Sequence, residues 1–184
     1  MARERREFKK EEKQYDERVL AIDRVARVVK GGRRFRFRAL MVIGDGKGKV
    51  GIGSAKGADV TSAISKATDI AKKNIAVVTI DKGTIPHDEQ AKVSGAVVFI
   101  KPASPGTGLI AGGVVRVVLE VAGFKDVLSK SLGSSNKTNI AYATVAALKA
   151  IQPREKWHTT SLDADKKENK KKVASEATKD KVSA

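Results

Sequence analysis

The chain has 184 residues, with 37 Lys and Arg against 21 Asp and Glu, so its formal net charge at pH 7 is +16. Such an excess repels itself unless a polyanion neutralises it, which indicates a nucleic acid or an anionic membrane surface as partner. The sequence has no Cys, which excludes disulfides and thiolate chemistry. It also has no secretory signal pattern and no apolar run near the roughly 20 residues that cross a bilayer, so we expect a cytoplasmic protein.

The N-terminal half alternates between turn residues and β-branched runs. Residues 1–17 mix charges of both signs and predict a mobile arm or one that a partner orders. A folded block is expected over residues 18–82. It should contain two strands joined by a hairpin turn at Gly31-Gly32, a second turn at 44–49 and a short strand at 50–53. A helix over 58–74 and a short edge strand complete this block.

Side chains alternate between the two faces of a strand. In the second strand this period places arginines on one face and an apolar set on the other: Phe35, Phe37, Ala39, Met41 and Ile43. We expect the apolar face to pack against the helix, whose apolar stripe is Val60, Ala63, Ile64, Ala67, Ile70 and Ala71. Phe35 and Phe37 could instead stack on bases, but the aliphatic residues that share their face favour a place in the core.

A polar stretch around residues 81–89 indicates a boundary, followed by a second folded block over 83–152. We expect a strand over 91–101, a glycine-rich loop over 102–113, a strand over 125–133 and a final helix capped by Asn136 or Thr138. The segment 114–122 is ambiguous because its valines favour a strand, but its flanking glycines favour a helix. Residues 153–184 predict a flexible charged tail. The fold class is therefore α+β with two domains.

The strongest functional feature is the first hairpin. Residues 24–38 contain no acidic residue and seven cations: Arg24, Arg27, Lys30, Arg33, Arg34, Arg36 and Arg38. A projecting hairpin of this composition suits phosphate contacts with RNA or DNA, and its glycines let the backbone approach another backbone closely. The alternative is a solvated charged edge that protects the sheet from aggregation.

The second turn, residues 46–51, matches the pattern G-x-G-x-x-G. A dinucleotide site would need a helix to open at the last glycine, whereas a strand is predicted there. We interpret this segment as a turn that presents Lys47 and Lys49 to phosphate.

The loop over 102–113 is the main indication of an enzyme. Its glycines could form an anion-binding nest before a helix N-terminus, and it faintly resembles the phosphate loop of small-metabolite kinases such as galactokinase and homoserine kinase. No carboxylates in an evident paired arrangement accompany it, which disfavours phosphotransfer. The same nest could hold an RNA phosphate. His87 and His158 lie too far apart in the sequence to predict a metal site.

Three segments resemble bacterial small-subunit ribosomal protein five in that family's order and spacing, over about residues 17–151: VARVVKGGRRFRFRALMVIGDGKGKVGIGSAKG, KPASPGTGLIAGG and KDVLSKSLGSSN. The resemblance implies an N-terminal domain similar to a double-stranded-RNA-binding fold, with three strands backed by a helix. It also implies a C-terminal α/β domain of the ribosomal-protein-five domain-2-like fold, which those kinases share and which serves here as a scaffold.

By this resemblance the chain would be a structural constituent of the small (30S) ribosomal subunit that binds 16S ribosomal RNA. It would contact small-subunit proteins four and eight, support translational accuracy and lie near the mRNA entry path. No enzymatic activity, cofactor, metal, membrane or small-molecule substrate is expected. A free-standing binder of double-stranded RNA is the alternative. The expected RNA-binding residues are Arg24, Arg27, Lys30, Gly31, Gly32, Arg33, Arg34, Arg36, Arg38, Lys47, Lys49 and Lys56.

Overall fold

The computed structural model describes residues 15–153 and Trp157. Almost all of the predicted arm and tail therefore lies outside the described residues. Residues 15–151 pack as one compact unit. No helix in the described part of the chain is long and apolar enough to span a bilayer.

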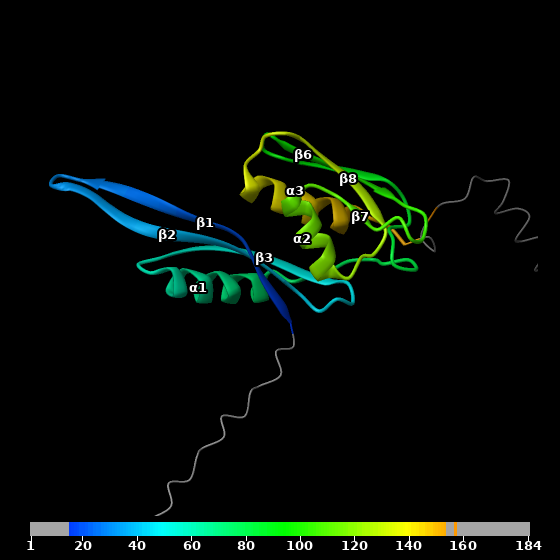
Figure 1. Ribbon diagram of the computed structural model, residues 1–184, viewed down its shortest axis with the longest axis horizontal. Helices are drawn as coiled ribbons and strands as arrows, with labels where there is room; N and C mark the ends of the chain where they lie inside the picture. The colour runs from blue at the N-terminus through cyan, green and yellow to red at the C-terminus, as the bar shows by residue number, and fades with distance from the viewer. Residues whose placement is uncertain (1–14, 154–156, 158–184) are drawn as a thin grey trace, which may run out of the picture. The chain divides into compact units, whose positions relative to one another are not determined.

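The N-terminal half is a four-stranded antiparallel sheet with one helix on it (Figure 1). The strand order is β1-β2-β3-β4. β1 begins two residues before the predicted start and β3 is longer than predicted. The elements are β1 Asp16–Val29, β2 Gly32–Gly44, β3 Lys49–Gly57, α1 Val60–Lys73 and β4 Ala76–Val77.

Helix α1 lies very close to the sheet because small residues face one another at the contact. Ala63 and Ala67 are fully buried against β2, and glycines lie beneath the helix on β3. A Cβ on Gly53 would lie 2.1 Å from the carbonyl oxygen of Ala67, far inside van der Waals contact. The predicted apolar stripe is confirmed along its alanines, whereas Ile70 stays 37% exposed.

Strands β1 and β2 continue beyond the end of β3 as a two-stranded hairpin (Figure 1). β3 ends at Gly57, opposite Phe37, while the pairing of β1 with β2 continues to Val29 and Gly32. We call residues 24–36 the distal hairpin. The predicted turn is present, although of its two glycines only Gly32 has a positive φ, of 141°.

The C-terminal half is a second four-stranded sheet, in the order β5-β6-β8-β7, with two helices. β7 runs parallel to β8 and the other pairs are antiparallel. The elements are β5 Glu89–Val93, β6 Ala96–Pro102, β7 Leu109–Ile110, α2 Gly113–Ala122, β8 Val127–Gly133 and α3 Lys137–Ala150.

Two predictions for this half are confirmed and one is wrong. The ambiguous valine-rich segment is helix α2, and the Asn136 side chain caps α3 by accepting a hydrogen bond from the Thr138 N–H at 3.1 Å. The single strand predicted over 91–101 is instead a hairpin of β5 and β6. Its turn is Ser94-Gly95, and Ser94 adopts a φ of 54°, which no apolar pattern in the sequence indicates.

One hydrophobic core joins the two halves. Leu40 and Val42 of β2 belong to the same buried cluster as Val115 and Leu119 of α2. The inner part of β2 is therefore covered on both faces, by α1 on one side and by α2 on the other. The division into domains at 18–82 and 83–152 stays a prediction.

Candidate nucleic-acid interface

The register of β1 and β2 sorts the hairpin cations between two faces. Arg27 lies directly opposite Arg34, and Val25 lies opposite Arg36. Because directly opposite residues share a face, Arg27, Arg34 and Arg36 project on the same side. We call this side the arginine face.

Towards the sheet, the arginine face continues into Arg38. Arg38 lies opposite Asp23 on β1 and opposite Lys56 on β3. Its Nη2 is 2.7 Å from a carboxylate oxygen of Asp23, so an acidic residue of the same chain neutralises the charge of this arginine. Lys56 extends the positive surface onto the third strand, a position that only the register reveals.

The three arginines of the arginine face have no such compensation. Among the described residues, no hydrogen bond or ion pair involves the side chains of Arg27, Arg34 or Arg36. Like charges directly opposite each other destabilise a strand pair. The hairpin therefore concentrates positive charge that an external polyanion would neutralise.

The other side of the distal hairpin, the Phe35 face, mixes aromatic and basic side chains. The prediction that Phe35 faces the helix as core is wrong, because Phe35 is 47% exposed. β3 stops opposite Phe37, so the sheet that α1 covers ends before Phe35. Phe37 is half-buried and packs on the α1 core, as predicted. The Arg24 guanidinium lies over the Phe35 ring, 3.7 Å from its centroid, in a cation–π contact.

The hairpin tip is open. Lys30, Gly31 and Gly32 are exposed, and a Cβ on either glycine would meet no atom within 4 Å. Arg33 follows directly and lies on the Phe35 face, opposite Val28. The tip can therefore lie close against another surface.

Lys47 lies in the turn from β2 to β3 and Lys49 is the first residue of β3, so both are at the other end of β2 and do not join the hairpin cations. The backbone N–H groups of both lysines donate to Asp45 Oδ1, at 2.8 and 3.0 Å. Those of Gly46 and Gly48 donate to carbonyl oxygens at the end of α2. Only the exposed lysine side chains remain to meet a phosphate.

The same turn perturbs one carboxylate. Burial raises the pKa of Asp45, but the backbone N–H groups of Lys49 and Lys47 that donate to it stabilise the charged form more. The net result is a pKa below the ordinary 3.8.

The glycine-rich loop does form an anion-binding nest, but the chain supplies the anion itself. Asp126 Oδ1 accepts hydrogen bonds from the N–H groups of Gly106 and Gly108, at 3.0 and 2.8 Å. These are the donors that a bound phosphate would need. The interpretation of this loop as a phosphate site is therefore disfavoured, and its donors serve instead to fix the loop against β8.

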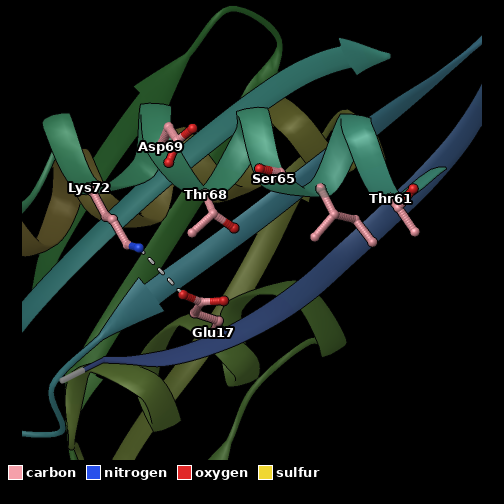
Figure 2. A pocket seen from close by; sticks show the side chains of 7 residues that line it. Glu17, Thr61, Ser65, Thr68, Asp69 and Lys72 are labelled. Atoms are coloured by element: carbon pink, nitrogen blue, oxygen red, sulfur yellow. Dashed lines mark ion pairs between the residues drawn. The ribbon is translucent and has the colours of Figure 1, made fainter. Parts of the chain in front are cut away.

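A groove lies between β1 and α1 (Figure 2). It measures about 390 Å³, and Lys72 reaches across it to within 3.7 Å of Glu17. The other lining residues are Thr61, Ile64, Ser65, Thr68 and Asp69. Its two carboxylates do not favour a phosphate, and the described residues contain no cluster of potential metal ligands. The distal hairpin is the better candidate for a polyanion.

The prediction that Phe35 is buried was wrong, although the sequence contained an indication that this residue is exposed. The predicted helix start at residue 58 leaves at most residues 50–57 for the third strand, which is too short to reach Phe35 across the sheet. That shortness indicated that residues near the first turn extend beyond the sheet, where an aromatic side chain has no core to enter.

Two family models match the chain, and together they cover both halves and the hairpin. The model for ribosomal protein S5, N-terminal domain, matches residues 15–79, and the model for ribosomal protein S5, C-terminal domain, matches residues 91–160. The two sheets and three helices of the described residues agree with the mixed α+β fold expected from the resemblance. The chain therefore belongs to the ribosomal protein S5 family, which has a structural role in the small ribosomal subunit and binds ribosomal RNA.

Proposed function

We propose that the distal hairpin is the main contact of this chain with ribosomal RNA. On the arginine face, Arg27, Arg34 and Arg36 bind backbone phosphates, and Lys56 extends that contact along the sheet. Lys30 and the two glycines of the tip approach the RNA backbone closely. The observation that carries this proposal is the set of three neighbouring guanidinium groups without an acidic partner among the described residues.

The more specific role in the ribosome is also a proposal, and it rests on the resemblance to small-subunit ribosomal protein five. The chain binds 16S ribosomal RNA in the cytoplasm, contacts small-subunit proteins four and eight, supports translational accuracy and lies near the mRNA entry path. It acts as a scaffold and not as an enzyme. The internal carboxylate in the glycine-rich loop supports the last point, because it takes the donors that a phosphotransferase would direct at its substrate.

Binding to purified 16S ribosomal RNA, measured over a range of salt concentrations, tests the hairpin. Each phosphate contact contributes about −0.7 to −0.9 to the slope of log K against log salt. Replacing Arg27, Arg34 and Arg36 with Ala should therefore make the slope shallower by about 2 to 3. The affinity at 0.1 M salt should fall by at least two orders of magnitude, because about 0.9 log unit is lost per contact.

The matched control removes three other exposed cations, Lys92, Lys101 and Lys130, from the second sheet. This variant has the same net charge as the arginine variant, so it separates a local contact from the effect of total charge. Equal losses in the two variants would show that the hairpin is not the main contact. Co-sedimentation with the small subunit at moderate salt should follow the same order, with the lysine variant retained and the arginine variant released.

A further inference from the structure

We propose that Phe35 and Arg24 form a stacking platform for an unpaired RNA base on the Phe35 face of the hairpin. This inference rests on the proposed RNA contact of the arginine face and adds a second, chemically different contact behind it. Phosphates would bind on one face of the two-stranded hairpin and a base on the other.

The geometry of the ring supports this role. Phe35 remains 47% exposed although the Arg24 guanidinium covers its ring at 3.7 Å. Its cross-strand neighbour is Ala26, whose side chain is too small to cover a phenyl ring. Nothing in the α1 core reaches it, since the helix packs on Ala39 and Met41 further along β2. The ring therefore keeps surface that a flat ligand can cover.

The surroundings indicate which flat ligand fits. Arg24 and Arg33 share the face with Phe35, and no acidic residue lies between residues 24 and 38. A ligand that places an aromatic plane on the ring and a negative group beside it matches this charge pattern. A nucleotide has both, and bases stack on aromatic rings and on arginine guanidinium planes.

The base has to be unpaired and unstacked. In a paired helix both faces of a base are already covered by its neighbours, and side chains cannot enter the deep groove of an RNA helix. A bulged or splayed nucleotide beside a helix whose phosphates lie on the arginine face would satisfy both sides of the hairpin.

The experiment places an indole in the ring position. Trp157 is the only tryptophan of the chain, so Phe35→Trp in a Trp157→Phe background gives a single reporter. Binding of purified 16S ribosomal RNA should quench the fluorescence of this indole strongly, because a base stacks on it. A fully paired RNA duplex bound to the same protein should leave the fluorescence nearly unchanged.

Affinity measurements give the second readout. Phe35→Leu keeps an apolar side chain but removes the π face, so affinity for 16S ribosomal RNA should fall about fivefold to a hundredfold. The slope of log K against log salt should not change, because no phosphate contact is lost. Phe35→Tyr should bind like the unmodified protein, and Val77→Ala, at an exposed aliphatic residue of β4 outside the hairpin, should have no effect.

Three results would overturn the proposal: an unquenched indole in a protein that still binds the RNA, an unchanged affinity for Phe35→Leu, or a slope that becomes shallower by about one unit. The last would mean that the ring only positions Arg24 against a phosphate. All three leave the arginine face intact, whereas failure of the proposed RNA contact would show in the triple arginine variant.

Discussion

Replacing Arg34 with Glu should stabilise the free protein while it weakens RNA binding. In the folded hairpin Arg34 lies directly opposite Arg27, with Arg36 two residues further along the same face. A glutamate at this position would convert a repulsive cross-strand pair into an attractive one. The two effects have opposite signs because the arginine face is arranged for a polyanion that the free protein lacks.

The magnitudes follow from the two contacts. Cross-strand charge pairs contribute about 0.2–1 kcal/mol, so reversing one pair should raise the free energy of unfolding by about 0.5–1 kcal/mol. For a folded unit of this size, that corresponds to a Tm increase of about 1–4 °C. Losing one phosphate contact should weaken RNA binding about eightfold at 0.1 M salt, and the added carboxylate should weaken it further.

Thermal melts and RNA binding of Arg34→Glu and Arg34→Ala, each at low and high salt, measure both effects. The gain in Tm for the glutamate variant should shrink at 1 M salt, where the Debye length is about 3 Å. A glutamate variant that is no more stable than the alanine variant at low salt would refute the repulsion argument. Unchanged RNA affinity in both would refute the role of the arginine face.

Three further predictions concern the supporting structure. Gly53→Ala should lower the free energy of unfolding by about 1–3 kcal/mol because the added Cβ would collide with α1. Gly31→Ala, at the open tip, should leave the melting temperature almost unchanged. Equal melting temperatures for the two variants would contradict the close approach of the helix. Asp126→Ala should speed amide hydrogen exchange in the glycine-rich loop without changing RNA affinity, and a large loss of affinity would instead indicate that the loop meets RNA. The pKa of Asp45 is lowered in the fold. The ionised Asp45 carboxylate therefore stabilises the fold fully above about pH 4, and this stabilisation disappears as the pH falls through the lowered pKa. Asp45→Asn should therefore flatten the pH dependence of the melting temperature in acid, and a profile identical to that of the unmodified protein would contradict this.

Local patterns were enough to predict most elements of the N-terminal half. The hairpin turn at Gly31-Gly32 and the alanine stripe of α1 follow from short-range rules: glycine at a tight turn, a period of two in strands and a period of 3.6 in helices. The cations of residues 24–38 were visible for the same reason, since they are neighbours in the sequence. The β5–β6 hairpin was missed although Ser94-Gly95 is a dipeptide typical of turns, because residues 91–101 were interpreted as one continuous strand.

The tertiary structure determined which segments distant in the sequence pair or pack with one another. The register of three strands placed Lys56 beside Arg38 and paired Arg38 with Asp23, which left Arg27, Arg34 and Arg36 uncompensated. The packing of α2 on the first sheet joined two halves that the sequence separates.

The sequence alone showed a strongly basic hairpin and indicated an RNA partner, because charge and the order of motifs can be read directly from the residues. Only the fold decided which cations act together and that Phe35 lies outside the core. Burial depends on where β3 ends and where α1 covers the sheet, and those limits are set by contacts between residues far apart in the sequence. For the same reason the anion nest of the glycine-rich loop could be predicted, but its occupant, Asp126, could not.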